Sequence, residues 1–394
     1  AKVNYEDVFS QVRMWDNYIY VELLKRKIAI PPKKQNDKSE KYAGAYVKEP
    51  IPGFYDWVVS FDLNSLYPHL IMQYNISPET LQDVRHPQAT VDRILEQEID
   101  IDGEFAVCAN GAQYSKDQHG FLPQMMKKMY DSRVIFKKKM IKAKQEYEKT
   151  PTVELMKEIA RCNNIQMAKK ISLNSAYGAI GNEHFRYYRL ANAEAITLSG
   201  QVSIRWIENR MNEYLNKLLS TEKEDYVIAS DTDSIYLNLG PLVNKFLSSK
   251  SGDKAAVVAL LDKICQEKLE PFIERSYQEL ADYVSAYDQK MSMKRENIAD
   301  RGIWTAKKRY ILNVWDSEGV RYKEPKMKIM GLETARSSTP AYFRDKLYAA
   351  FKIIIGKTND ELISFINDVR TETRNQHYSE VAFPRGCNNL AKYR

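Results

Sequence analysis

Residues 226–239 contain two short apolar runs, YVIA and IYLNL, on either side of the polar centre Ser230-Asp231-Thr232-Asp233-Ser234. Asp, Thr and Ser are good turn formers, and short apolar runs separated by a few such residues are typical of two paired strands. The sequence therefore predicts a β-hairpin that carries acidic residues at its tip.

Two acids of this tip, Asp231 and Asp233, are two residues apart and would point to the same face of a strand. Two ionised carboxylates about 4 Å apart repel each other by roughly 4 kcal/mol at an effective dielectric constant near 20. Such a pair needs a cation, a raised pKa or full solvation. For the pair alone, an ordinary polar turn is the more frequent explanation, and a metal site is the alternative.

A third acid favours the metal site. Asp62 follows the run Trp57–Phe61, whose β-branched and aromatic residues are typical of a buried strand, and it opens the segment DLNSLYP. A charged side chain at the end of such a strand is costly unless it is used. Hard oxygen ligands from separate strands are what Mg²⁺ ions require, and two such ions can activate an attacking oxygen and stabilise a leaving oxygen in phosphoryl transfer.

A helical hairpin is predicted in the middle of the chain. One helix is expected over residues 123–148 and a second over 153–178, with Thr150-Pro151 between them. The stretch 126–144 of the first helix contains eight Lys or Arg and one Asp, a net charge of +7 that equals the net charge of the whole chain. So concentrated a basic strip is typical of an anion-binding surface.

The two helices present cations and polar groups at helical spacing. Arg133 and Lys137 are four residues apart on the first helix, and Lys170, Asn174 and Tyr177 share one face of the second. Three cations on two adjacent helices could grip a triphosphate, because Arg supplies a bidentate fork and Lys a point charge. The alternative is a solvated basic face, which we favour for four other lysines: Lys138, Lys139, Lys142 and Lys144.

Two other segments suit nucleic acid. Tyr177-Gly178 ends the second helical stripe, where the aromatic ring and Gly allow close approach of a flat base, or where Gly simply caps the helix. Lys307-Lys308-Arg309-Tyr310 alternates basic and aromatic character beside an expected strand at 310–315, which suits a nucleic-acid backbone.

The rest of the sequence indicates a mixed α+β fold with a helical insertion and a helical C-terminal part. From about residue 338 the pattern becomes helical, with Phe343, Leu347 and Phe351 at four-residue spacing, and residues 31–41 are expected to form a surface loop. A length of 394 residues favours two or three domains.

Several classes of protein are disfavoured. No run of 18 apolar residues is present, which argues against a transmembrane helix. The four cysteines are far apart and form no CxxC pair, so a disulfide framework or a zinc site is not expected and a reducing cytosol is the simpler setting. Neither a GxxxxGK nor a GxGxxG loop occurs. The chain begins with Ala, which indicates a processed product or an excised fragment.

Taken together, these residues resemble family B DNA polymerases, and the resemblance covers nearly the whole chain. It is carried, in the family's order and spacing, by DLNSLYP at 62–68, KISLNSAYG at 170–178, DTDS at 231–234 and KKRY at 307–310. The stretches YVKEPIPGFYDWVVSFDLNSLYP, NISPETL, FRYY and KIMGLETARSSTP resemble the replicative polymerases of T-even-type tailed bacteriophages in particular.

The resemblance implies an α+β right-hand polymerase fold with an antiparallel-sheet palm, helical-hairpin fingers and a partial, mostly helical thumb. The implied parts are a remnant of an N-terminal region at 1–33, the palm at 34–122 and 183–331, the fingers at 123–182 and the partial thumb at 332–394.

The resemblance also implies roles for the matching residues. Asp62 and Asp233 would hold two Mg²⁺ ions, for which Mn²⁺ can substitute, with the backbone carbonyl of Leu63 assisting and Asp231 as the third catalytic acid. Tyr67 resembles the steric gate that disfavours a ribose 2′-hydroxyl. The implied nucleotide-binding residues are Leu66, Tyr67, Arg133, Lys137, Lys170 and Asn174. The implied DNA-binding residues are Tyr177, Gly178, Lys307, Lys308, Arg309 and Tyr310, and Thr232 and Glu296 would support the site.

The implied function is template-directed addition of deoxynucleoside triphosphates to a primer 3′ end in phage DNA replication, in the cytoplasm of the infected bacterial host. Primer-template DNA is the implied partner, and a separate exonuclease part and replisome proteins are further candidates; no membrane is implied. Two alternatives remain open: a catalytically weak or inactive DNA-binding fragment, and an accessory subunit whose acids merely cap a hairpin.

The ends of the chain lead to one further expectation. Asp62 lies 61 residues from the start, which leaves no room upstream for a proofreading exonuclease, and the chain stops soon after Lys392, early for a complete thumb. Asp102-Gly103-Glu104 has a DxE spacing, but it falls within the expected palm and is rejected as an exonuclease site. A polymerase core without a proofreading domain is therefore expected.

Overall fold

A computed structural model describes residues 3–34, 36, 41–246, 253–356 and 358–393. Its centre is a six-stranded sheet in the order β4-β5-β1-β6-β7-β8, with every neighbouring pair antiparallel. The strands are β1 (Gly53–Leu63), β4 (Val227–Asp231), β5 (Ser234–Asn238), β6 (Met293–Ala306), β7 (Arg309–Ser317) and β8 (Val320–Met330). The expected strand at 57–61, the acid-tipped hairpin and the strand at 310–315 are confirmed.

The central strand β1 is buried on both faces because apolar layers cover both sides of the sheet. Val59 and Phe61 belong to the larger core, which also includes residues of the covering helices, whereas Val58 faces a smaller aromatic cluster around Trp304 and Tyr310. The alternation follows from the two-residue repeat of a strand, and it explains why this run of sequence carries apolar side chains on both faces.

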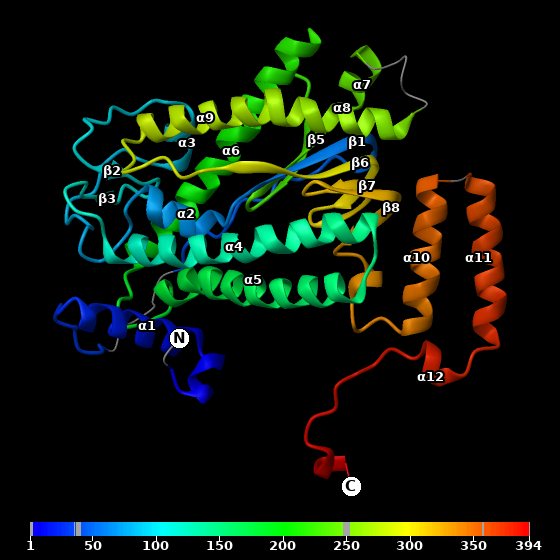
Figure 1. The fold of residues 1–394 in the computed structure, drawn as a ribbon, viewed down its shortest axis with the longest axis horizontal. Coiled ribbons are helices and arrows are strands. Elements are labelled where there is room, and N and C mark those ends of the chain that lie inside the picture. Colours follow the sequence, from blue (N-terminus) through cyan, green and yellow to red (C-terminus); the bar gives the residue numbers. More distant parts are fainter. Residues whose placement is uncertain (1–2, 35, 37–40, 247–252, 357, 394) are drawn as a thin grey trace.

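The helices that cover the larger core are α2 (Leu66–Gln73), α6 (Leu190–Leu219), α8 (Lys254–Ile264) and α9 (Glu270–Tyr283), with a short π-helical segment, η3 (Cys265–Leu269), between the last two (Figure 1). The smaller elements are η1 (Tyr5–Phe9), α3 (Val91–Leu95), β2 (Ala106–Val107), β3 (Gln113–Tyr114), α7 (Gly240–Phe246), η4 (Glu333–Ala335), α12 (Tyr378–Val381) and η5 (Leu390–Tyr393).

The helical hairpin consists of α4 (Phe121–Lys149) and α5 (Val153–Ile180), which lie side by side along the body in Figure 1 and confirm the sequence prediction. The turn between them begins α5 with Thr152, whose side chain accepts a hydrogen bond from the Leu155 amide at 3.2 Å. The helix ends at Gly181, so the alternative in which Gly178 is the cap is wrong.

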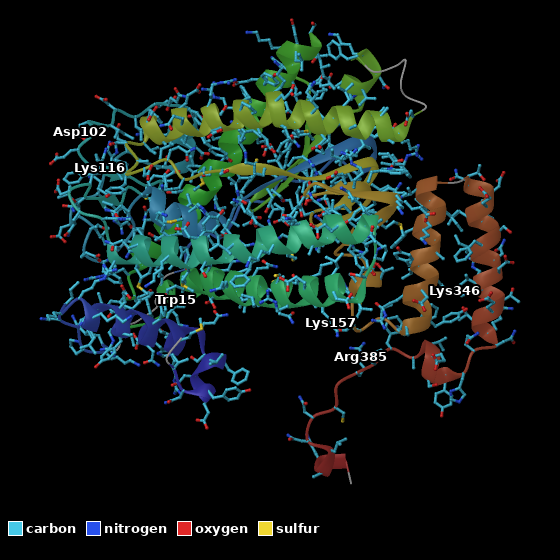
Figure 2. The ribbon with its side chains drawn as sticks, in the orientation of Figure 1. Trp15, Asp102, Lys116, Lys157, Lys346 and Arg385 are labelled. Atoms are coloured by element: carbon cyan, nitrogen blue, oxygen red, sulfur yellow. The ribbon has the colours of Figure 1, made fainter. Side chains whose placement is uncertain are left out.

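Helix α1 (Gln11–Lys25) fixes the hairpin from outside. The indole of Trp15, labelled in Figure 2, donates to the Ser172 carbonyl at 3.1 Å and to the Ser175 hydroxyl at 3.0 Å. Because Trp15 is only 2% exposed, these bonds satisfy a buried donor while its ring packs in the core.

The C-terminal part is helical, as expected, with α10 (Ala341–Gly356) and α11 (Asn359–Arg374) standing beyond β8 in Figure 1. Thr358 and Glu361 form a reciprocal capping box at the start of α11. Of the expected loop at 31–41, residues 31–34, 36 and 41 have no regular structure, and the others lie outside the described residues. No helix in the described part is long and apolar enough to span a bilayer.

Candidate active site

The ends of three strands converge at one edge of the sheet. In β1, Asp62 lies opposite Ser234 of β5 on one side and Lys294 of β6 on the other. The amide of Leu63 then donates to the Asp233 carbonyl at 2.8 Å. Acids that are about 170 residues apart in the sequence are thus brought together by strand pairing alone.

The β4–β5 turn is tight and strained. Asp231 pairs with Ser234, so only Thr232 and Asp233 form the turn, and Thr232 has φ of +61°. The amide of Asp233 donates to the Asp231 carbonyl at 2.6 Å, a bond across one residue that is typical of a γ-turn. The Thr232 amide also donates to the Tyr46 carbonyl at 3.0 Å, which holds the turn from outside the sheet. Positive φ at a β-branched residue persists only where its surroundings impose it.

This turn corrects the expectation that Asp231 and Asp233 share a strand face. Asp233 lies in the turn and not on a strand, so the two-residue alternation does not apply to the pair. Asp231 instead accepts a hydrogen bond from the Thr232 hydroxyl at 3.0 Å and forms an ion pair with Lys308 at 3.1 Å. Asp233 lines the adjacent cavity together with Asp62.

A β-bulge directs a further acid to the same place. The pairing of β1 with β6 shifts between Ser60 and Phe61, which leaves Glu296 as an extra residue between the partners Asn297 and Arg295. Bulges of this kind change the direction of a side chain and are frequent beside active sites. Glu296 consequently faces the cavity, where both of its oxygens lie 3.1 Å from the Lys328 ammonium.

The cavity, of about 280 Å³, is bounded by the β1 end, the β4–β5 turn and the α4–α5 hairpin. It gathers twelve residues singled out from the sequence: Asp62, Leu63, Leu66, Tyr67, Arg133, Lys137, Lys170, Asn174, Tyr177, Thr232, Asp233 and Glu296. Three lining residues were not predicted: Asn64, Ser65 and Glu318. A sequence signal for Glu318 is lacking, because DSEG at 316–319 matches an ordinary hairpin turn.

The carboxylates of Asp62 and Asp233 are destabilised in their ionised form. Burial, followed by repulsion from Asp233, raises the pKa of Asp62, and burial raises the pKa of Asp233, with Asp231 adding to the effect. Neither acid forms an ion pair with Lys, Arg or His in the described part of the chain. Bound divalent cations would relieve this repulsion.

The carboxylates of the cavity suit divalent cations that take only some of their ligands from the protein. Among the described residues, no group of three or more Asp, Glu, His or Cys side chains is arranged to hold a metal. Mg²⁺ is commonly bound through one or two carboxylates, with the remaining ligands coming from water and substrate phosphates. Two hard carboxylates beside a cationic wall are consistent with that pattern, with Leu63 also lining the cavity.

Two cations of the wall lack acidic partners. The Arg133 side chain is buried, donates to the Ser65 hydroxyl at 2.6 Å and leaves its Nε without a hydrogen-bond partner. Burial lowers the pKa of Arg133. Neither Arg133 nor Lys170 pairs with a carboxylate among the described residues. Arg133 is buried and Lys170 is exposed. A buried cation without a counter-ion is costly, so the part of this wall that Arg133 forms is suited to an anionic ligand.

An aromatic pair forms another side of the cavity. The rings of Tyr67 and Tyr177 are 4.6 Å apart, and the Tyr177 hydroxyl lies 3.1 Å from that of Tyr42. Gly178 does not line this cavity, and a side chain there would approach Gln11 of α1. The prediction that both Tyr177 and Gly178 contact DNA remains untested.

The predicted DNA-contact segment lies on the β6–β7 hairpin, away from the cavity lining. Each of its four residues has a partner within the chain: Lys307 with Glu49, Lys308 with Asp231, Arg309 with Glu333 and Tyr310 with Tyr236. Of the lysines on α4 expected to be solvated, Lys139, Lys142 and Lys144 are exposed, and Lys138 is exposed at the rim of a second cavity.

A partly buried ion-pair network next to the acid turn was not predicted from the sequence. The Lys48 ammonium lies 2.7 Å from a carboxylate oxygen of Glu208 and 2.7 Å from one of Asp225. Glu208 also accepts from the Ser230 hydroxyl at 3.2 Å, and the Lys48 amide donates to the Ser230 carbonyl at 3.0 Å. The network fixes the strand that carries Asp231.

His69, on α2 behind the cavity, predicts a pH dependence of stability. Its ring is 6% exposed, packs edge-on against Tyr130 and hydrogen-bonds to the Ser65 carbonyl at 3.0 Å.

Burial lowers the pKa of His69 from 6.5 to about 4, so between these values the unfolded chain binds more protons and folding weakens as pH falls. Relative to a His69→Gln variant, we expect the wild type to lose about 2 kcal/mol of unfolding free energy between pH 7.5 and 5.0 in urea titrations. Parallel pH profiles for the two proteins would contradict this.

Comparison with known proteins gives a consistent result. The family model for DNA polymerase family B matches residues 11–259. The chain is 36% identical to the DNA-directed DNA polymerase of Escherichia phage RB69 and 33% identical to that of Enterobacteria phage T4, in each case over 100% of this chain and 49% of the relative. It is 27% identical to a DNA polymerase of Pyrococcus glycovorans over 84% of this chain and 34% of the relative. The chain therefore spans about half the length of the phage relatives.

Proposed function

Because this chain belongs to DNA polymerase family B, we propose that it adds deoxynucleoside triphosphates to the 3′ end of a primer under the direction of a DNA template. The observation that carries the proposal is a single cavity lined by both acids and cations. Asp62 and Asp233 supply its acids, and Arg133 and Lys170, which have no carboxylate partner among the described residues, supply its cations. In such a cavity, the cations would bind the phosphates of a nucleotide, and the acids would bind the metal ions that phosphoryl transfer needs.

The proposed division of labour follows the fold. The six-stranded sheet and its covering helices would be the palm, at 34–122 and 183–331, and the α4–α5 hairpin would be the fingers, at 123–182. Residues 332–394, with α10 and α11, would form part of the thumb, and residues 1–33 would belong to an N-terminal region.

In the proposed reaction, the primer 3′-hydroxyl attacks the α-phosphate of the bound nucleotide and pyrophosphate leaves. Asp62 and Asp233, with the Leu63 carbonyl, would hold two Mg²⁺ ions, or Mn²⁺ in their place. The positive charge of these ions would activate the attacking oxygen and stabilise the leaving oxygen. Arg133, Lys137 and Lys170 would bind the triphosphate.

Further residues would position the nucleotide and the template. Tyr67, against Tyr177, would exclude a ribose 2′-hydroxyl, and Asn174 and Leu66 would complete the nucleotide pocket. Asp231 would position the acid turn through Thr232, with Glu296 supporting the site from the bulge. The proposed DNA contacts are Tyr177, Gly178, Lys307, Lys308, Arg309 and Tyr310.

The proposed setting is phage DNA replication in the cytoplasm of an infected bacterium, since the similar phage proteins are DNA polymerases. Primer-template DNA and deoxynucleoside triphosphates would be the substrates. A separate exonuclease part and replisome proteins are proposed as further partners.

Primer extension by the purified chain tests the proposal. We expect a labelled primer annealed to a longer template to grow by the complementary nucleotide when Mg²⁺ is present, and not by the other three nucleotides. DNA binding that weakens with salt, without incorporation in Mg²⁺ or Mn²⁺, would instead identify a DNA-binding fragment.

A further inference from the structure

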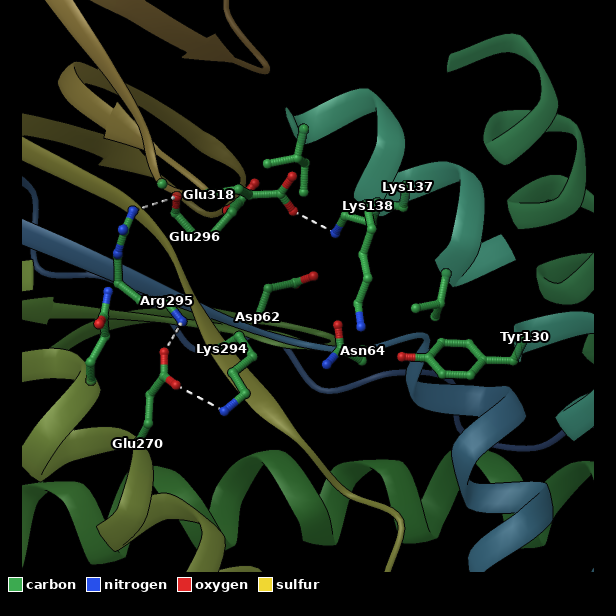
Figure 3. Close-up of a pocket in the computed structure, with 14 residues that line it drawn as sticks. Asp62, Asn64, Tyr130, Lys137, Lys138, Glu270, Lys294, Arg295, Glu296 and Glu318 are labelled. Carbon is green, nitrogen blue, oxygen red and sulfur yellow. Dashed lines mark hydrogen bonds and ion pairs between the residues drawn. The ribbon is translucent and has the colours of Figure 1, made fainter. Parts of the chain in front are cut away.

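Glu318 reaches from the β7–β8 turn to helix α4. Its carboxylate lies 2.6 Å from the Lys137 ammonium, and both side chains remain partly exposed (Figure 3). The turn that presents Glu318 is constrained, because Glu318 has φ of +51° and its amide donates to the Glu296 carbonyl at 2.6 Å. Glu318 is therefore held in place by the backbone.

Glu318 lies where two cavities meet, as Asp62 and Glu296 also do. Glu318 lines the 280 Å³ cavity and also the adjoining cavity of about 610 Å³ drawn in Figure 3. Lys137 lines both as well, so the ion pair lies where the two cavities adjoin. A ligand that fills this region meets the ion pair.

Polar side-chain contacts connect α4 with the β7–β8 hairpin at several points. Besides the Lys137–Glu318 pair, the Gln145 side chain donates to the Gly319 carbonyl at 3.1 Å, and Lys326 lies 3.1 Å from Glu148. Glu148 lines neither cavity, so the Lys326–Glu148 pair attaches the same two elements without adding charge to the site.

The charges of the smaller cavity distinguish Lys137 from its neighbours. Three cations of the α4–α5 hairpin line it, namely Arg133, Lys137 and Lys170. Within the described residues, Lys137 is the one of these that has a carboxylate partner. Glu318 thus supplies to Lys137 the negative charge that the other two lack.

We propose that Glu318 stands in for a nucleotide phosphate: it neutralises Lys137 before a nucleotide binds, keeps α4 against the β7–β8 hairpin, and must be displaced from Lys137 when a nucleoside triphosphate binds. This inference rests on the proposed function for the identity of the ligand. A partly exposed ion pair is weak, whereas a triphosphate offers several charged oxygens to the same ammonium. Glu318 therefore lowers nucleotide affinity modestly and sets the resting position of α4.

The test compares Glu318→Gln with the wild type on primer-template DNA. With a 3′-dideoxy primer, which prevents chemistry, we expect the Kd of the next correct deoxynucleoside triphosphate to fall about two- to fivefold. With an extendable primer, the KM should fall by the same factor and kcat should stay within about twofold. The matched control is Glu148→Gln, which breaks the ion pair of α4 with Lys326 of the same hairpin and should leave both constants unchanged.

Each other outcome identifies a different failure. An unchanged Kd in Glu318→Gln means that the acid does not compete with nucleotide. Equal shifts in both variants mean that docking of α4, and not competition at Lys137, governs affinity. A large loss of kcat at constant KM places Glu318 at the reacting atoms. All three overturn the inference while wild-type extension still supports the polymerase, whereas a wild type that neither binds nor incorporates nucleotide refutes the proposed function as well.

Discussion

Asp233→Asn is expected to reduce template-directed primer extension at saturating nucleotide by about 10³-fold or more, or about 4 kcal/mol in activation free energy. The substitution keeps the volume of the side chain and the tight turn, but it replaces one of the two carboxylates proposed as metal ligands with a neutral amide. Single-turnover extension assays in Mg²⁺ and in Mn²⁺ measure the effect.

The same variant should be more stable than the wild type when divalent cations are removed. A carboxyl group whose pKa is raised by folding destabilises the folded state above its unfolded pKa, so at pH 7.5 loss of the charge at Asp233 favours folding. Thermal unfolding in EDTA should show a higher midpoint for Asp233→Asn. A variant that loses activity and gains stability cannot owe its inactivity to misfolding.

The matched control for this experiment is Asp102→Asn, which makes the same change on an exposed acid at the periphery (Figure 2). We expect it to leave extension and stability unchanged. Extension by Asp233→Asn within tenfold of the wild type in both metals would exclude Asp233 as a metal ligand.

Arg133→Gln should lower kcat/KM for the incoming nucleotide by about 10²-fold, or about 3 kcal/mol. The guanidinium is buried, unpaired with any described carboxylate and bonded to Ser65 alone, so a phosphate would gain a fully desolvated charge-assisted contact. The titration of nucleotide concentration in steady-state extension measures the change.

Lys142→Gln is the control for Arg133→Gln, because Lys142 is an exposed cation on the same helix outside both cavities. If the two variants lose the same small factor, the basic charge of α4 acts at a distance and Arg133 has no specific contact. A loss confined to Arg133→Gln supports direct binding of the triphosphate.

Local sequence patterns were sufficient for some of the elements and for part of the cavity lining. Leu63, Leu66, Tyr67 and Glu296 came from the family resemblance alone. The β-branched and aromatic residues at 57–61 predicted β1, and two apolar runs around turn-forming residues predicted the β4–β5 hairpin. Helical spacing predicted α4 and α5, with Arg133 and Lys137 on a common face. These features depend on neighbours within a few residues, which a single sequence displays directly. The family resemblance then related the separated segments to one another.

The tertiary structure decided the features that depend on partners distant in the chain. The strain at Thr232, which separates Asp231 from Asp233, comes from a contact with Tyr46, and the bulge at Glu296 arises from pairing with β1. Neither contact leaves a periodic pattern in the sequence.

Glu318 shows most clearly the difference between what the local sequence predicts and what tertiary contacts decide. In the sequence it is one polar residue in the turn DSEG, and nothing local distinguishes it from a solvated turn residue. Its importance comes from the stacking of the β7–β8 hairpin beside α4, which brings an acid within 2.6 Å of a lysine 181 positions earlier. The sequence by itself determined which elements form and which charges they carry, because those depend on local periodicity. Only the tertiary structure decided which charges meet, because that depends on how strands and helices pack.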